Sequence, residues 1–168
     1  YGDLQMTFTP ASYKEGVQSE LDSQPGMTIA VWQQRPESTG YVRARSADPF
    51  EKPIIQPNYL ASDIDQRVIT GGIKLGRRLF QTEPLAPYFE SELSPGDDVQ
   101  SDADILNYAR GRGTTAFHPM GTCRMGPATD PGAVVDHELK VHGIEGLRIA
   151  DASIMPTMPS ANTNAASL

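Results

Sequence analysis

The sequence is poor in cysteine, since Cys123 is the only one among 168 residues. A single thiol excludes a disulfide within the chain, so the fold must rest on packing and hydrogen bonding, and cysteine usage gives no sign of an oxidising compartment. The sequence also lacks any stretch near the roughly 20 consecutive apolar residues that cross a bilayer. These absences predict a soluble chain without a transmembrane segment.

An excess of positive charge is also missing. Lys and Arg number 14 against 21 Asp and Glu, which gives a formal net charge of -7, and neither sign forms a dense run. Nucleic acids and anionic membranes are bound by clustered cationic faces. The charge pattern therefore predicts no nucleic-acid partner.

The length of 168 residues is enough for one domain of ordinary size. The chain starts at Tyr1 without an initiator Met and closes at the apolar Leu168, so we expect it to be a piece of a longer protein. A targeting segment can be argued neither for nor against, because the true N-terminus is expected to be absent.

Alternation of apolar and polar residues predicts strands in the first 45 residues. They are expected at Leu4–Phe8, Met27–Trp32 and Tyr41–Arg45. The turn-rich run 35–40 is expected to join the last two as a hairpin. A further strand is expected near Phe89–Leu93.

Helical periodicity predicts a helix over Ser62–Phe80, capped by the Ser62 side chain. Its inward stripe is expected to consist of Ile64, Val68, Gly72, Leu75 and Leu79. Each glycine of Gly71-Gly72 costs about 1 kcal/mol relative to alanine in a helix, so we expect close packing against another backbone there. A second capped helix is expected over Ser101–Arg110.

These elements predict an α+β fold: an antiparallel β-sheet with helices packed on one face, followed by an irregular C-terminal segment. From Gly113 onward the chain is rich in Gly, Pro, Thr, Ser and Asn, with only short apolar bursts. Such a segment forms few regular elements, and loops are where functional sites tend to lie.

A glycine pattern at Gly111–Ala116 matches the dinucleotide-binding fingerprint in residue types. The fingerprint needs a strand before it and a helix after it, whereas here a predicted helix precedes and Phe117-His118-Pro119 follows. We therefore interpret the pattern as a helix C-terminus followed by a loop.

Four side chains of the last third could supply tetrahedral metal ligands: His118, Cys123, His137 and His142. Spacing alone is weak evidence for such a site, and His137 and His142 are better interpreted as solvated loop histidines. A zinc-stabilised binding module stays open as an alternative.

Two runs in the same segment carry more chemistry. His118 lies before a proline and a glycine turn that restrain the backbone, and histidine is the side chain whose ordinary pKa lies near neutrality, which suits a general base. The run 146–151 is interpreted as a short apolar strand ending in Asp151-Ala152-Ser153, which offers a carboxylate and backbone N–H groups to a cofactor or forms a capped turn.

The motifs in order resemble the C-terminal part of the glucose-methanol-choline (GMC) oxidoreductases, and most closely the choline-dehydrogenase-like branch. The resemblance covers nearly the whole chain. It is carried by Arg35-Pro36-x-Ser38-x-Gly40, Pro53-x-Ile55-x-x-Asn58-Tyr59-Leu60, His118-Pro119-x-Gly121-Thr122-Cys123-Arg124-Met125-Gly126, Gly146-Leu147-Arg148, Asp151-Ala152-Ser153 and Asn162-Thr163-Asn164.

The resemblance implies oxidation of a primary alcohol to an aldehyde by hydride transfer to FAD. It implies that His118 takes the hydroxyl proton as general base and that Asn162 hydrogen-bonds the substrate oxygen. By the same resemblance, Asp151 and Ala152 lie against the ribityl-phosphate part of FAD. Thr163 and Asn164 approach its pyrimidine edge, largely through backbone groups.

The resemblance also implies a division of labour along the chain. Residues 1–115 would form the substrate-binding domain, and residues 116–168 the catalytic-histidine and flavin-contacting segment. FAD would be bound mainly by an absent N-terminal domain, which would be the partner of this chain, so we expect the chain alone to be inactive and to hold FAD weakly. A homo-oligomer and a catalytically silent interaction domain stay open as well.

Overall fold

The computed structural model describes residues 2–14 and 20–168. These fall into two units: the helix–sheet unit, Gly2–Gln33 with Leu60–Thr114, and the loop unit, Gln34–Tyr59 with Thr115–Leu168. The expected division into a substrate-binding part (residues 1–115) and a catalytic, flavin-contacting part (residues 116–168) is a division by function, and it stays a prediction. No helix in the described ranges combines the length and apolar character needed to cross a membrane.

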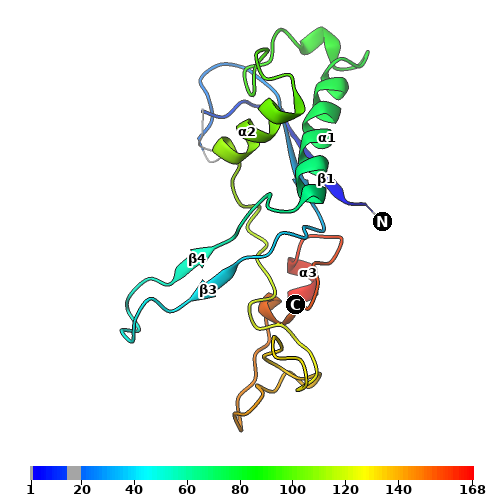
Figure 1. Ribbon diagram of the computed structural model, residues 1–168. Coiled ribbons are helices and arrows are strands. Elements are labelled where there is room, and N and C mark those ends of the chain that lie inside the picture. The colour runs from blue at the N-terminus through cyan, green and yellow to red at the C-terminus, as the bar shows by residue number, and fades with distance from the viewer. Residues whose placement is uncertain (1, 15–19) are drawn as a thin grey trace. The chain divides into compact units, whose positions relative to one another are not determined.

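Two antiparallel strands form the base of the helix–sheet unit. β1 (Leu4–Thr9) pairs with β2 (Thr28–Gln33) in a register that runs from Leu4 opposite Gln33 to Thr9 opposite Thr28. Helix α1 (Asp63–Phe80) packs against both strands, and α2 (Asp102–Arg112) packs against α1, as Figure 1 shows. The first two predicted strands and both predicted helices are therefore confirmed.

Both helices begin at the predicted caps. The Ser62 hydroxyl oxygen accepts from the Ile64 N–H at 3.3 Å, and the Ser101 hydroxyl oxygen accepts from the Asp104 N–H at 3.1 Å. Each bond satisfies an N–H that has no partner inside the helix. Helix α2 runs to Arg112 with Gly113 as its C-cap, so the glycine pattern at Gly111–Ala116 begins inside the end of a helix, as interpreted from the sequence.

Helix α1 meets the strands through glycine. A Cβ on Gly72 would lie 2.8 Å from Leu4 Cδ1 and 3.4 Å from Val31 Cβ, and a Cβ on Gly76 would lie 3.4 Å from Ile29 Cγ2. The predicted close approach is thus real, but it is made to strand side chains rather than to another backbone. The absence of two side chains lets the helix lie directly on the sheet.

The inward stripe of α1 differs from the prediction. Leu79, expected inside, is 36% exposed, and a Cβ on Gly71 would meet nothing within 4 Å. The buried positions on the helix are Asp65, Thr70, Gly72 and Gly76. Because the glycines permit the closest approach, the helix turns them toward the strands and moves Leu79 outward.

The strand expected at Phe89–Leu93 is absent from the described residues, and this prediction is wrong. A 3-10 helix, η1 (Ala86–Tyr88), precedes the segment, and Phe89 stacks on Phe80 of α1 with ring centroids 5.7 Å apart. Arg77 binds both carboxylate oxygens of Glu92 and also donates to the backbone carbonyls of Gly96 and Val99, at 3.3 and 2.7 Å. Side chains of α1 thus hold this segment by an ion pair and a ring contact, where a strand was expected.

The loop unit contains a separate hairpin of β3 (Tyr41–Arg43) and β4 (Ile54–Gln56), visible in Figure 1. The prediction that the third strand pairs with the second is therefore wrong, and the sheet predicted as one is two. The reason lies at Gly40, where a Cβ would come within 1.9 Å of the Gln56 carbonyl oxygen. The absence of a side chain at Gly40 therefore permits the close approach that accompanies the β3–β4 pairing.

The rest of the loop unit is built from turns and two short helices, η2 (Ala152–Ile154) and α3 (Asn164–Ser167). Isolated bridges join Met125 to Val135, Val135 to Val141 and Lys140 to Arg148. Val135 lies at their centre and is fully buried. The α+β class is confirmed, with strands and helices of short length.

Candidate active site

The segment that carries His118 has a restrained backbone. Phe117 adopts a left-handed conformation (φ 59°), which is uncommon for a residue with a bulky side chain, and its N–H donates to the Thr115 hydroxyl oxygen at 3.1 Å. Pro119 follows with its fixed φ, and Gly121 supplies a second left-handed residue (φ 82°). His118 is half-buried between these fixed points.

Backbone hydrogen bonds join the His118 run to the Asp151 run. Three alternate amides of residues 121–125 donate to three consecutive carbonyls of η2. The bonds run from Gly121 to Ala152 (3.3 Å), from Cys123 to Ser153 (2.9 Å) and from Met125 to Ile154 (2.8 Å). Two motifs about 30 residues apart in sequence therefore lie side by side.

Asp151 forms the cap of η2. Its Oδ1 accepts from the Ser153 N–H at 2.7 Å, and hydrogen bonds from Ser153 hold the pKa of this exposed carboxyl below its usual value. The residues before it form one isolated bridge at Arg148 rather than the expected strand. Of the two interpretations of this run, the capped turn is the one observed.

Thr163 is the residue that reaches His118. Its Oγ1 lies 3.3 Å from His118 Nδ1, and the residue is only 6% exposed. The contact spans 45 positions of sequence. Sequence reasoning missed it, because no local pattern links a threonine to a histidine at that separation.

The neighbours of Thr163 face outward. Asn162 and Asn164 are exposed, and no hydrogen bond joins Asn162 to His118 in the part of the chain that the structure describes. Asn164 begins α3, whose Ser167 hydroxyl donates to the Thr163 carbonyl at 2.8 Å. Of the predicted site residues, His118 and Thr163 are thus brought into direct contact.

The four residues considered as metal ligands do not form a cluster. Within residues 2–14 and 20–168, no group of three or more His, Cys, Asp or Glu side chains is arranged to hold a metal ion. His137 is exposed, as predicted, but His142 is half-buried and its Nε2 lies 3.0 Å from the Gly126 carbonyl oxygen. The description of His142 as a solvated loop histidine is therefore wrong, because the ring anchors a turn.

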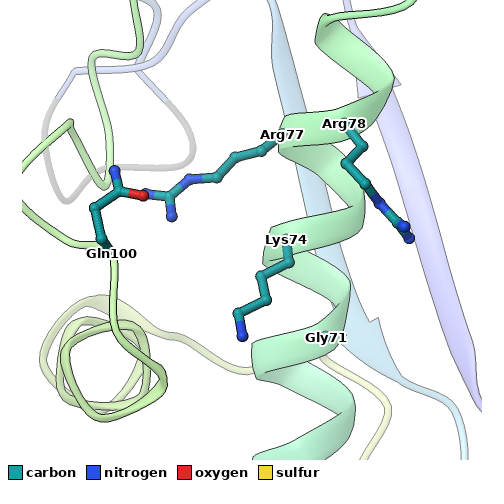
Figure 2. A pocket seen from close by; sticks show the side chains of 5 residues that line it. All are labelled: Gly71, Lys74, Arg77, Arg78 and Gln100. Atoms are coloured by element: carbon teal, nitrogen blue, oxygen red, sulfur yellow. The ribbon is translucent and has the colours of Figure 1, made fainter.

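A hollow of about 430 Å³ lies beside α1 in the helix–sheet unit (Figure 2). Among its lining residues, Lys74 forms an ion pair with Asp102, and Arg77 forms one with Glu92 at 2.8 Å. The Glu92 hydrogen bond raises the pKa of Arg77 above its already high value. These ion pairs join α1 to α2 and to the segment that carries Glu92, and the hollow contains none of the predicted site residues.

Comparison with known families identifies the chain. The GMC oxidoreductase family model matches residues 36–168. The chain belongs to the GMC oxidoreductase family. The matched range includes the β3–β4 hairpin and every predicted site residue of the loop unit.

Curated GMC relatives match along nearly all of the chain. The mitochondrial choline dehydrogenase of Mus musculus is 40% identical over 97% of the chain and 27% of its own length. The alcohol dehydrogenase [acceptor] of Pseudomonas putida is 40% identical over 97% of the chain and 29% of its own length. The oxygen-dependent choline dehydrogenase of Brucella ovis is 40% identical over the whole chain and 30% of its own length. The chain thus spans less than a third of these relatives.

Solved structures of GMC-like enzymes share the fold. Pyridoxine 4-oxidase from Mesorbium loti matches with a TM-score of 0.86 and 29% identity, over 98% of this chain and 32% of its own. A fungal aryl-alcohol oxidase matches with a TM-score of 0.74 and 31% identity, over 89% of this chain and 24% of its own.

Proposed function

We propose that this chain is the C-terminal, substrate-side part of an FAD-dependent oxidoreductase that converts a primary alcohol to an aldehyde, with His118 as general base. The observation that supports this proposal is the hydrogen bonding of the two ring nitrogens of His118, in a chain of the GMC family. Nδ1 lies 3.3 Å from Thr163 Oγ1, while Nε2 has no hydrogen-bond partner among the described residues. A ring held at one nitrogen can accept a proton at the other.

The substrate class is inferred from the named relatives. Choline and pyridoxine both carry primary hydroxyl groups, and the other named relatives include an alcohol dehydrogenase and an aryl-alcohol oxidase. What they share is the oxidisable CH–OH group rather than the rest of the molecule. We therefore assign a primary alcohol and leave its remaining structure to the shape of the complete pocket.

Two side chains handle the substrate oxygen in this proposal. Nε2 of His118 takes the hydroxyl proton, and the exposed carboxamide of Asn162 donates a hydrogen bond to the oxygen as negative charge develops on it. An asparagine cannot serve as a base near neutral pH. Proton removal therefore rests on His118, and Asn162 contributes electrostatic stabilisation.

The residues of the loop unit fit part of an FAD site. Asp151 presents an exposed carboxylate that can accept from ribityl hydroxyls, and Asn164, at the start of α3, would approach the pyrimidine edge largely through its backbone. Ala152 and Thr163 would contribute backbone contacts. Residues 2–14 and 20–168 contain no strand–glycine loop–helix unit for the diphosphate, so the N-terminal domain would hold most of FAD. When bound, FAD supplies the hydride acceptor.

The N-terminal domain is the proposed partner of this chain. Relatives are more than three times as long, and the loop unit exposes large apolar side chains, including Phe50 at 93% and Phe117 at 74%. Exposed apolar surface of this kind is typical of an interface that another domain covers. We propose that the rest of the longer protein covers this apolar surface.

The test is His118→Ala in the full-length enzyme. Anaerobic reduction of FAD by alcohol should slow by about 100-fold or more, because the proton acceptor is removed. His137→Ala is the matched control, since His137 is exposed and lies outside the proposed site. An unchanged rate of reduction in the His118 variant would contradict the proposed base.

A further inference from the structure

We propose that Thr163 is the positioning residue of His118: its Oγ1 accepts the Nδ1 hydrogen and leaves the Nε2 lone pair available to the substrate. The inference rests on the proposed base function of His118 and deepens it. It assigns the Thr163 side chain a role that is separate from the backbone contact with FAD.

Burial singles out the Thr163 side chain. Thr163 is 6% exposed, whereas its neighbours Asn162 and Asn164 are both exposed. A buried hydroxyl group needs a hydrogen-bond partner, because losing water without one is costly. The partner that the structure gives the Thr163 hydroxyl is His118 Nδ1, at 3.3 Å.

The backbone holds the hydroxyl and the ring within one frame. Thr163 precedes α3, and the Ser167 hydroxyl closes this turn on the Thr163 carbonyl. Helix α3 packs against η2, and the three amides of the run 121–125 tie η2 to the loop that carries His118. Thr163 and His118 are therefore both fixed to η2.

Only one direction of this hydrogen bond suits a base. If the Thr163 hydroxyl donated to Nδ1, the neutral ring would carry its proton on Nε2 and could not take another there. If Oγ1 accepts from Nδ1–H, the Nε2 lone pair is free. The imidazolium formed after proton transfer still donates through Nδ1, so the same bond persists through the step.

The bond also limits ring rotation. A histidine ring can turn about its χ2 torsion, which has broad minima and exchanges the positions of its two sides. A hydroxyl held beside Nδ1 favours one of these orientations. The reactive nitrogen thus stays on the side of the ring that faces away from Thr163.

The kinetic test compares two substitutions in the full-length enzyme. Thr163→Val replaces the hydroxyl with a methyl group of similar volume and should slow anaerobic FAD reduction about 10-fold, the scale of one lost hydrogen bond. Thr163→Ser keeps the hydroxyl and should stay within about 3-fold of the wild type. Thr129→Val, at an exposed threonine of the loop unit, should leave the rate unchanged. Equal losses in the Val and Ser variants would overturn the inference.

A spectroscopic readout does not depend on activity. In full-length enzyme with 15N-labelled histidine, the neutral His118 ring should show a protonated Nδ1 and an unprotonated Nε2, and Thr163→Val should lose this preference. A wild-type ring protonated on Nε2 would overturn the inference even if a variant failed to fold. If His118→Ala leaves FAD reduction unchanged, the proposed function fails. The measured tautomer of His118 would still show whether Thr163 Oγ1 accepts the Nδ1 hydrogen.

Discussion

The helix–sheet unit and the loop unit are stabilised in different ways. In the first, α1 lies on two strands through Gly72 and Gly76, and α2 places Ile105 and Ala109 among the buried side chains. Among the described residues of the loop unit, Val135 is the only fully buried apolar side chain. This unit is held together mainly by hydrogen bonds between backbone groups of its turns. The proposed site lies in the unit whose order depends on hydrogen bonds rather than on a large core.

Aspartates carry much of that order in the loop unit. Asp130 accepts from Gly132 N–H at 2.9 Å, Asp136 accepts from Lys140 N–H at 2.9 Å, and Asp151 accepts from Ser153 N–H at 2.7 Å. Each of these bonds closes a turn within a few residues. Hydrogen bonds from backbone amides to aspartate side chains thus fix the backbone of this unit, whereas helix and strand hydrogen bonds fix the backbone of the other.

The largest effect is expected from Gly40→Ala in the loop unit. The new Cβ would lie 1.9 Å from the Gln56 carbonyl oxygen and 2.7 Å from Pro57 Cα, both of them backbone atoms that cannot rotate away. We expect the β3–β4 pairing to be lost, at a cost above about 3 kcal/mol, beyond ordinary overpacking.

Hydrogen exchange of the full-length variant would measure this loss at Tyr41–Arg43 and Ile54–Gln56. If the two units open separately, α1 should keep its protection. Retained protection of the hairpin in the variant would contradict the assigned role of Gly40.

A smaller effect is expected from Gly72→Val in the helix–sheet unit. The branched side chain would press on Leu4 and Val31, and overpacking of this kind costs about 1–3 kcal/mol. Gly71→Ala is the matched control: its Cβ meets nothing within 4 Å, so it should stabilise α1 by about 0.5–1 kcal/mol. Urea unfolding of the full-length variants measures both, and destabilisation by Gly71→Ala would count against this packing.

The smallest effect is the response of the loop unit to acid. The Lys140 N–H, and next the Glu138 N–H, hold the pKa of Asp136 below its usual value. A carboxyl with a lowered folded pKa stabilises fully above its unfolded pKa of about 3.9 and loses that contribution as pH falls through the folded value. As pH falls from about 4 through the folded pKa, the turn at residues 136–140 should therefore open more often.

Hydrogen exchange at Glu138 and Lys140, corrected for the intrinsic effect of pH, would follow this opening. Asp136→Asn keeps an acceptor oxygen but does not titrate, so it should remove the pH dependence. Amides around Gly72 should not respond, because that contact is apolar. If the pH-dependent opening persists in the Asp136→Asn variant, a group other than Asp136 causes it.

The helices were predicted well from the sequence, because capping residues and apolar periodicity involve residues only a few positions apart. Ser62 and Ser101 each bond an amide two or three positions on. Non-local choices were harder to predict. The partner of Tyr41–Arg43 proved to be Ile54–Gln56, at a close approach that Gly40 permits, and Phe89–Leu93 does not form a strand.

The candidate site divides along the same line. The motifs at His118, Asp151 and Asn162–Asn164 were evident in the sequence because residue type and spacing mark them. The contact between Thr163 and His118 could not be predicted, since it joins residues 45 positions apart through η2.

The sequence by itself determined the family, the absence of an internal disulfide and the positions of the capped helices, because each depends on residues close together in the chain or on composition. The tertiary structure decided which strands pair, that Gly76 rather than Leu79 faces the sheet, and which hydroxyl meets the His118 ring. These depend on the path of the backbone, which brings distant groups within hydrogen-bond or van der Waals distance.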